Sequence, residues 1–436
     1  MDTTRARRGL VASSLSASLV LATAVAVSAQ DAEPVTLSVL VDTTDVTNAR
    51  VQALADAYTA MHPNVTFELE HRPQGAEGDN VVKTRLATGE MNDVFWYNSG
   101  SLLQALNPSE TLVDISDEAC VANLQESYLP TVSDDQGTYG VPGETAMAGG
   151  ILYNKAIYEE LGLEVPTTWE EFAANNETIK AAGIAPVGQT YAGDSTWTSQ
   201  LFVLADYYNV QAANPAFADE YTNNQAKYAT TPAALAGFER LQQGFEDGWW
   251  QEDFGSATYD EGLTLLAEGQ IAHYPMLTFA LPTLAERDPE GGQNIGFFAQ
   301  PGDSADGNGA TIWMPGSLYI PNTTENVDVA KDFLCFVASV EGTEVLTEAV
   351  APSGPYVVKG ATLPDDVLPA VQDIQAYIDA GASAPALEFL SPIKGPALEQ
   401  ITVEVGSGLR DAADAAALYD EDVQKQALQL GIPGWE

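Results

Sequence analysis

The chain has 436 residues, more than one hydrophobic core usually supports, so its length predicts two domains. Its 62 Asp and Glu residues outnumber its 17 Lys and Arg residues, and the formal net charge is −45. A negative field of this size opposes binding to nucleic acid, to an anionic membrane or to an anionic ligand.

The first 29 residues have the pattern of a secretory signal peptide. Arg5, Arg7 and Arg8 precede an apolar stretch over residues 10–27, and residues 27–29 (VSA) fit a signal-peptidase site. An N-terminal membrane anchor is the alternative. No Cys ends the apolar stretch, so we expect no lipid anchor. The pattern predicts export across the cytoplasmic membrane to a periplasm or to the cell exterior.

The chain has two cysteines, Cys120 and Cys335. Two cysteines in an oxidising compartment are able to form one disulfide. Cys335, however, lies in the helix-like run 329–339, where a buried free thiol fits equally well. The sequence leaves both possibilities open, and its cysteine spacing excludes a Cys-based zinc site.

β-type runs alternate with helical periodicity at the start of the mature chain. Strands are predicted over residues 36–41, 65–69 and 93–97, and helices over 46–61 and 81–88. This alternation predicts an α/β fold with a mostly parallel sheet. Ligands of such sheets bind beyond the carboxyl ends of the strands. The candidate ligand-binding residues at these ends are Asp42, Thr43, Gln74, Tyr97, Asn98 and Ser99.

The stretch 139–155, YGVPGETAMAGGILYNK, is the expected first crossing between the two domains. Its apolar, Gly-rich part over residues 148–153 predicts a buried strand. Pro142 and Gly143 predict a turn into that strand, and Glu144 follows them at its entrance. A strand that crosses between domains also serves as a hinge, so Glu144 joins the candidate ligand-binding residues.

The rest of the chain continues the α/β pattern, with strands predicted at 184–187 and 271–274. Two further crossings are predicted near 311–320 and 352–358, which makes a hinge of three segments. Thr168 and Glu171 fit a capping box. Helices are predicted over residues 156–162, 168–182, 232–245, 258–268, 327–339, 365–378, 396–405 and 411–430.

The segment "YG-P … YNK", followed by PTTWEEF at 166–172, resembles family 1 extracellular solute-binding proteins, which feed sugar ABC transporters. The segments HPNV, DVFW, AEGQIAHYPM and APSGPYVV extend this resemblance over nearly the whole mature chain. The resemblance implies a two-lobe, periplasmic-binding-protein-like fold of type II, as in maltose-binding protein, with flanking helices. It also implies a small-molecule carbohydrate as ligand, the membrane permease subunits of an ABC importer as partners, and ligand contacts from the three loops already described.

The domain boundaries follow from these crossings and from the resemblance. The expected parts are a signal peptide over 1–29, lobe 1 from 30–147 and 313–353, and lobe 2 from 148–312 and 354–436. The expected hinge segments lie near 144–152, 300–313 and 352–358.

Aromatic rings and carboxylates near the predicted cleft suit sugar recognition. A flat ring stacks on the apolar face of a pyranose, and carboxylates accept hydrogen bonds from its hydroxyls. Each candidate also has a structural alternative, because rings fill cores and carboxylates cap helices. The further aromatic candidates are Trp197, Tyr274, Trp313 and Tyr356, and Asp194 joins Asp42 and Glu144 among the carboxylates.

No catalytic or cofactor signature accompanies these residues. His62, His71 and His273 lack the HExxH spacing, and the sequence has neither a GxSxG motif nor a P-loop. We therefore predict a monomeric binding protein, without cofactor, metal or enzymatic activity, that captures a neutral oligosaccharide or glycoside and delivers it to an ABC importer. The alternatives are a secreted glycoside hydrolase and a binding protein for a cationic solute such as a polyamine.

Overall fold

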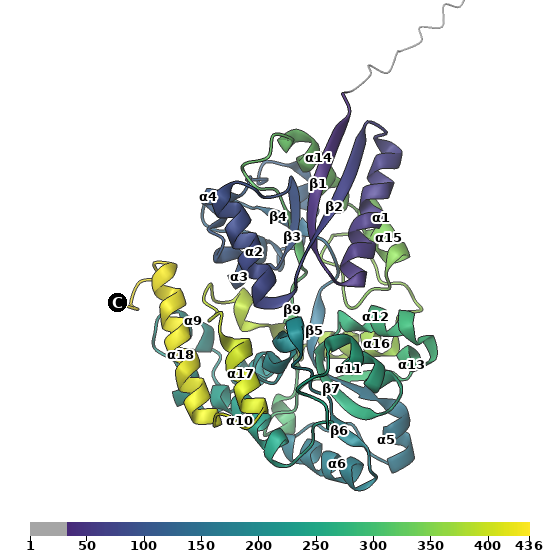
Figure 1. Cartoon of the computed structure of the whole chain (residues 1–436), viewed down its shortest axis with the longest axis vertical. Helices are drawn as coiled ribbons and strands as arrows, with labels where there is room; N and C mark the ends of the chain where they lie inside the picture. The colour runs from purple at the N-terminus through teal and green to yellow at the C-terminus, as the bar shows by residue number, and fades with distance from the viewer. Residues whose placement is uncertain (1–32) are drawn as a thin grey trace, which may run out of the picture. The chain divides into compact units, whose positions relative to one another are not determined.

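The computed structural model describes residues 33–436, so the predicted signal peptide lies outside the described residues. The strands of the described part form two separate β-sheets, one of five strands and one of six. Helices labelled in Figure 1 accompany both sheets, as expected for an α/β protein.

The five-stranded sheet has the order β2-β1-β3-β10-β4. β1 lies parallel to β2 and to β3, and the short β10 lies antiparallel to β3 and β4. The core beneath it is apolar because alternate residues of β1, including Leu37, Val39 and Val41, are fully buried. The strands of this sheet are β1 (Val35–Asp42), β2 (Val65–Arg72), β3 (Val94–Tyr97), β4 (Gly140–Pro142) and β10 (Ser317–Tyr319).

Helices from two distant parts of the chain cover this sheet. α1 packs on β1, β2 and α15, and Figure 1 shows α1 and α15 on the same side of the sheet. Cys120 of η1 and Cys335 of α14 form a disulfide, which decides between the two possibilities that the sequence left open. The elements are α1 (Asp45–Met61), α2 (Gly75–Thr88), α3 (Ser101–Gln104), α4 (Pro108–Thr111), η1 (Ala119–Asn123), η2 (Leu129–Val132), α14 (Val327–Val337) and α15 (Val340–Ala349).

The six-stranded sheet has the order β11-β9-β5-β7-β6, and β8 also pairs with β5. β5 is antiparallel to β7, β8 and β9, whereas β6 pairs with β7 and β11 with β9 in parallel. The strands are β5 (Met147–Asn154), β6 (Ala185–Val187), β7 (Ile271–Leu277), β8 (Ile295–Phe298), β9 (Ala310–Trp313) and β11 (Ser383–Pro385).

Both sheets are therefore mixed, and the expectation of mostly parallel sheets was wrong. The physical reason lies in the crossings. β5 begins where the chain arrives from the first sheet, and β9 ends where the chain returns to it, so the two strands run in opposite directions. Their register confirms this, because Met147 at the start of β5 pairs with Trp313 at the end of β9.

Helices follow most strands of the second sheet. The capping box predicted at Thr168 and Glu171 is present at the start of α6, and a second one, at Thr258 and Glu261, begins α11. The elements are α5 (Lys155–Leu161), α6 (Trp169–Ala181), η3 (Gly193–Gln200), α7 (Leu201–Leu204), α8 (Tyr207–Ala213), α9 (Phe217–Thr222), η4 (Tyr228–Thr230), α10 (Pro232–Glu246), α11 (Tyr259–Ala267), α12 (Ala280–Arg287), α13 (Pro289–Gln293), η5 (Ala305–Gly307), α16 (Pro369–Asp379), η6 (Leu387–Phe389), α17 (Leu398–Gly406) and α18 (Ala412–Gln429).

The chain passes between the sheets three times. The passages are residues 143–146, between β4 and β5, residues 314–316, between β9 and β10, and the segment from 350 to 368 that joins α15 to α16. The first passage is bonded to both others: the Gly143 amide donates to the Gly316 carbonyl (2.9 Å), and the Ala146 amide donates to the Pro355 carbonyl (2.8 Å). The three passages are thus tied together by backbone hydrogen bonds.

His273 on β7 is fully buried in the second sheet. Its Nδ1 is 2.9 Å from the Pro186 carbonyl, which only accepts, so Nδ1 carries the proton and Nε2 accepts from the Tyr158 hydroxyl at 2.8 Å. Burial lowers the pKa of His273 from 6.5 to about 3, which keeps the ring neutral in the folded protein.

His273 is expected to make the protein less stable in mild acid. Between about pH 6.5 and pH 3 the unfolded chain binds a proton at His273 that the folded protein excludes, so stability falls as the pH falls through this window. His273→Gln should flatten the slope of unfolding free energy between about pH 6.5 and 5, measured by urea denaturation. The matched control is His62→Gln, because the His62 side chain is 43% exposed. Equal slopes in wild type and His273→Gln would contradict the prediction.

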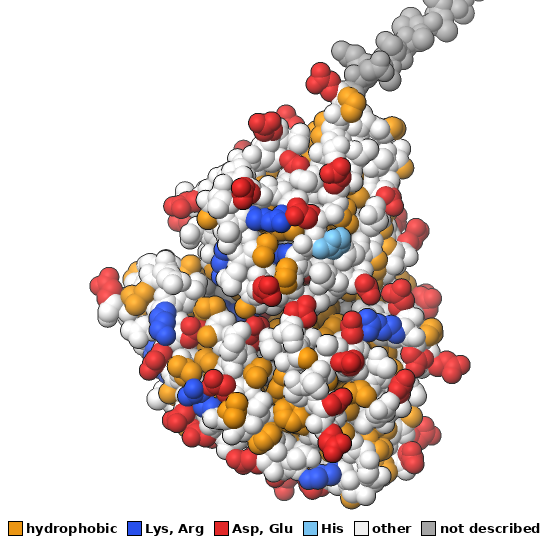
Figure 2. All heavy atoms as spheres, viewed as in Figure 1, with side chains coloured by type: hydrophobic (Ala, Val, Ile, Leu, Met, Phe, Trp, Pro, Cys, Tyr) orange, Lys and Arg blue, Asp and Glu red, His pale blue; other side chains and the backbone are white. Residues whose placement is uncertain are grey.

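Acidic side chains are scattered over the face shown in Figure 2, and Lys and Arg are few there. This distribution agrees with the net charge of −45. Within residues 33–436, no helix combines the length and the apolar character needed to cross a bilayer.

Candidate functional site

The carboxyl ends of β1, β2 and β3 meet at one edge of the first sheet, because these three strands are parallel neighbours. Asp42 at the end of β1 is aligned with Arg72 at the end of β2. Asp42 and Tyr97 are the last residues of β1 and β3, and the loops that follow the three strands carry the candidates Thr43, Gln74, Asn98 and Ser99.

Asp42 is buried, and its carboxylate is occupied by the turn into α1. It accepts hydrogen bonds from the Thr44 amide (2.8 Å) and from the Thr44 hydroxyl. Thr43 between them is exposed. Asp42 thus stabilises the start of α1, and Thr43 is the residue of this pair that presents its side chain to solvent.

Arg72, Asp79 and Tyr97 form a polar cluster at the ends of β2 and β3. Arg72 is 3% exposed, and its guanidinium carbon lies 5.6 Å from the centre of the Tyr97 ring. Burial raises the pKa of Asp79 on α2, although the positive charges of Arg72 and Lys83 oppose that shift. The Tyr97 hydroxyl interacts with the Asp79 carboxylate, whereas the Arg72 Nε is buried without a hydrogen-bond partner within the described part of the chain. The cluster therefore retains unused hydrogen-bonding capacity next to a carboxyl group.

Gln74, Asn98 and Ser99 lie in the loops that frame this cluster. Gln74 is the half-buried residue before α2, and its side chain does not cap the helix. The Asn98 carbonyl accepts a hydrogen bond from the Tyr319 hydroxyl (3.2 Å), and the Ser99 hydroxyl donates to the Pro315 carbonyl (2.9 Å). The Ser99 hydroxyl thus fastens the β3 loop to the second passage.

Glu144 lies in the first passage and is 8% exposed. One carboxylate oxygen is 2.7 Å from the Arg50 guanidinium, and the other accepts from the Gly316 amide at 2.9 Å. Burial raises the pKa of Glu144, and the opposing charge of Arg50 does not overcome this effect. Both oxygens are therefore engaged by protein groups that join α1 to the first and second passages.

Asp194 and Trp197 lie in η3, on the side of the second sheet. Asp194 is exposed, whereas Trp197 is half-buried, with ring-centre distances of 5.5 Å to Tyr259 and 5.8 Å to Phe279. The Trp197 Nε1 is buried without a partner among the described residues. η3 packs against both α2 and α17, so it lies where elements from the two sheets meet.

The remaining aromatic candidates occupy three different places. Trp313 is buried at the end of β9, and its Nε1 donates to Glu388 of η6. Tyr274 is buried in the core of the second sheet, where its hydroxyl lies 2.6 Å from that of Thr190. Tyr356 is buried beside α15, where its hydroxyl contacts Thr347. Trp313 is thus near η6, whereas Tyr274 packs in the core and Tyr356 lies in the third passage.

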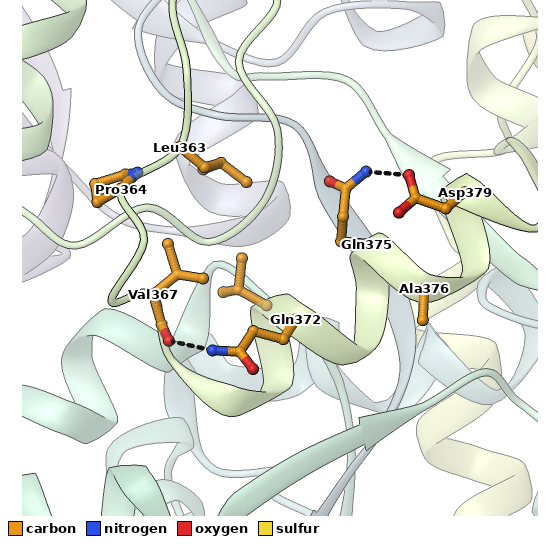
Figure 3. Close-up of a pocket in the computed structure, with 8 residues that line it drawn as sticks. Leu363, Pro364, Val367, Gln372, Gln375, Ala376 and Asp379 are labelled. Atoms are coloured by element: carbon orange, nitrogen blue, oxygen red, sulfur yellow. Dashed lines mark hydrogen bonds between the residues drawn. The ribbon is translucent and has the colours of Figure 1, made fainter.

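Two hollows indent the surface near the third passage, and they share Leu363 and Pro364. The first, of about 340 Å³, is shown in Figure 3. Its amides are satisfied locally, since Gln372 donates to the Val367 carbonyl and Gln375 to Asp379. The second, of about 320 Å³, contains Tyr356. The first hollow has no aromatic ring in its lining, and the second combines Tyr356 with Glu344 and Glu348 but contains none of the other candidate residues.

The structure brings candidates from both sheets together around the start of α2. A side-chain carbon built on Gly75 would lie 3.8 Å from the Asp194 carbonyl and 3.5 Å from the Glu399 carboxylate. One built on Gly100 would lie 2.4 Å from the Glu388 carbonyl, so the loop after β3 touches η6. Elements that the sequence separates by hundreds of residues therefore face one another here.

The candidate residues chosen from the sequence did not include Arg72, Asp79, Glu388, Lys394 or Glu399. Residues 72–74 were expected to form a ligand-facing loop, but only Gln74 was chosen from it, and the structure makes Arg72 the last residue of β2. Asp79 was missed because α2 begins at Gly75 and not at residue 81. No local pattern marks the acidic residues of the last hundred residues as neighbours of α2.

No three His, Cys, Asp or Glu side chains come together within residues 33–436 in a way that could hold a metal ion. The site is thus built from hydroxyl, carboxylate, guanidinium and aromatic groups, which recognise polar organic molecules through hydrogen bonds and ring contacts.

Comparison of the sequence with protein families identifies the family of this chain. The family model described as bacterial extracellular solute-binding protein matches residues 43–344. The chain belongs to this family. The multiple sugar-binding protein of Streptococcus mutans is 26% identical to this solute-binding protein over 319 residues, 72% of this chain and 73% of that protein. The melibiose/raffinose/stachyose-binding protein MelE of Bacillus subtilis is 23% identical over 321 residues, 71% of this chain and 72% of that protein.

Solved structures share the fold of this solute-binding protein. A chitin oligosaccharide binding protein has a TM-score of 0.79 and 21% identity, and the match covers 91% of this chain and all 100% of that chain. RafE in complex with raffinose has a TM-score of 0.73 and 21% identity, covering 91% of this chain and 99% of that chain. These matches confirm the predicted two-lobe, type II periplasmic-binding-protein-like fold. The family and these relatives are binding proteins rather than enzymes.

Proposed function

We propose that this solute-binding protein captures a neutral sugar, an oligosaccharide or glycoside, between two lobes and delivers it to an ABC importer. The observation that carries the proposal is the contact of α2 with η3 and of α3 with η6, which places the loops after β2 and β3 against the carboxylate-bearing elements of the second-sheet side. Relatives named for binding sugars support this ligand class.

The proposed mechanism is closure of two lobes about a three-segment hinge. Lobe 1 comprises residues 30–147 and 313–353, and lobe 2 comprises 148–312 and 354–436. Backbone hydrogen bonds link the three passages to one another. This arrangement supports a hinge at the passages, because the linked segments can bend together while the two lobes stay joined. A sugar that contacts both lobes favours the closed arrangement, which the permease subunits recognise.

The proposal includes the chain's place in the cell. It is exported through its signal peptide, carries no lipid anchor, works as a monomer in the periplasm or outside the cell, and releases its ligand unaltered. The family assignment supports an extracytoplasmic location and a permease as partner.

A thermal-shift screen tests the proposed function directly. A panel of raffinose, stachyose, melibiose and chitin oligosaccharides should contain a sugar that raises the melting temperature, because a ligand bound only to the folded state stabilises it by about 2.7 kcal/mol at a hundredfold excess over Kd. Spermidine and putrescine form the comparison arm. A shift with polyamines alone would favour the cationic ligand, and cleavage of the sugars detected by chromatography would favour a hydrolase.

A further inference from the structure

Glu399 in the first turn of α17 is a buried carboxylate on the second-sheet side of the candidate site. It is 8% exposed, and its Oε2 lies 3.5 Å from the position of a side-chain carbon on Gly75, the first residue of α2. The backbone of Glu399 is fixed, because its carbonyl accepts from the Ser199 hydroxyl of η3 at 3.0 Å. Glu399 therefore sits where α17, η3 and α2 meet.

The carboxylate of Glu399 has only weak support from its surroundings. Its Oε1 accepts from the neighbouring Gln400 amide (2.6 Å) and, at 3.4 Å, from the Thr196 hydroxyl. Lys394 is the cation that lowers its pKa, but Lys394 is ion-paired with Glu388 at 3.0 Å. Burial is the largest influence on the pKa of Glu399 and raises it. A buried carboxylate without its own cation costs stability.

Asp79 lies about one helical turn after Gly75 on α2, near enough to Glu399 for the two charges to interact. Each carboxyl group has a raised pKa because of burial, and the negative charge of Asp79 raises that of Glu399 further. Arg72, Lys83 and Lys394 are the positive groups that act on Asp79. The site thus holds one buried carboxylate, Glu399, and one half-buried carboxylate, Asp79, with incomplete compensation.

An open donor beside Asp79 is an independent observation that points to a ligand. Arg72 is 3% exposed, and its Nε lacks a hydrogen-bond partner among the described residues. The fully buried Tyr97 hydroxyl interacts with the Asp79 carboxylate and so does not supply this partner. Buried polar groups are normally satisfied, so a donor left open beside two under-compensated carboxylates indicates a missing partner that both donates and accepts.

We infer that Glu399 is a ligand-binding residue that accepts hydrogen bonds from sugar hydroxyls opposite Asp79, and that this pair selects neutral, hydroxyl-rich ligands against sugar acids. This inference rests on the proposed function. Hydroxyls both donate and accept, so a sugar donates hydrogen bonds to Glu399 and Asp79 and accepts one from Arg72. A sugar carboxylate would bring a third negative charge between the two acids.

The test compares Glu399→Gln with Glu404→Gln on the same helix. Glu404 is a suitable control because its side chain is 40% exposed and is paired with Arg410. Calorimetry with the most stabilising sugar of the panel should show about tenfold weaker binding by Glu399→Gln, the effect of one lost charge-assisted hydrogen bond. Glu404→Gln should bind as wild type does. The melting temperature of ligand-free Glu399→Gln should be unchanged or higher, because the change removes a buried charge.

Two further readouts separate a ligand contact from a structural role. Wild-type affinity should fall as the pH is lowered and the carboxyl takes up a proton, and Glu399→Gln should show a flatter profile. Galacturonic acid should stabilise Glu399→Gln more than it stabilises wild type. Unchanged affinity in Glu399→Gln, or parallel pH profiles with a lowered melting temperature, would overturn the role of Glu399 and leave the proposed function standing. Failure of the wild type to bind any sugar would overturn both.

Discussion

Arg50→Ala is expected to lower the free energy of unfolding by about 3–5 kcal/mol, the effect of removing one partner from a buried ion pair. The side chains of Arg50 and Glu144 are 5% and 7% exposed, so the change leaves a carboxylate buried without its cation. The pair joins α1 to the first passage, and Glu144 also holds the Gly316 amide of the second. The variant should therefore also weaken the contacts where the passages meet. Urea denaturation followed by circular dichroism measures the change in the free energy of unfolding.

The sign of the pH effect distinguishes this mechanism from a packing defect. Burial already raises the pKa of Glu144, and removal of Arg50 takes away an influence that lowers it. The folded variant then holds a proton on Glu144 at pH values where the unfolded chain, with its pKa near 4.5, has released it. Arg50→Ala should therefore lose less stability at about pH 5 than at about pH 7.5.

Two matched variants complete this test. Arg287→Ala removes an exposed pair with Asp260 and should cost less than about 1 kcal/mol. Arg50→Met combined with Glu144→Gln removes both charges but keeps an acceptor for the Gly316 amide, and it should recover most of the loss. A double variant as unstable as Arg50→Ala would contradict the electrostatic explanation.

Trp197→Ala is expected to weaken sugar binding about 10- to 100-fold, because burial of an aromatic face is worth about 1.5–3 kcal/mol. Trp197 is half-buried in η3, and its Nε1 is without a partner within the described chain. Its contacts with Tyr259 and Phe279 hold the ring in place. Calorimetry with the sugar selected by the thermal-shift panel measures the effect.

Trp197→Phe is the control for this change, since it keeps a ring that stacks but removes the Nε1 donor. It should retain affinity within about tenfold of wild type, the size of one lost hydrogen bond. Circular dichroism should show that both variants keep the native fold. An affinity for Trp197→Ala equal to that of wild type would remove Trp197 from the binding site.

Local patterns accounted for the regular elements of this chain. The residue types at 168 and 171 are enough to form a capping box, because both bonding groups lie within one helical turn. The alternation of strands and helices before residue 97 likewise predicted β1, β2 and β3, and so the edge of the sheet where Tyr97 lies. Element ends were less accurate, and the late predicted start of α2 hid Asp79 at the same edge.

The sequence by itself determined the α/β class, the family resemblance, the three crossings and the loops after the first three strands. These features depend on periodicity and on short motifs, which involve only residues close together in the sequence. The tertiary structure decided the mixed sheets, the Cys120–Cys335 disulfide, the engagement of Glu144 by Arg50, and the approach of Glu399 to Gly75. These contacts join residues far apart in the chain. They depend on burial and on charge pairing in the folded protein, which local sequence patterns do not predict.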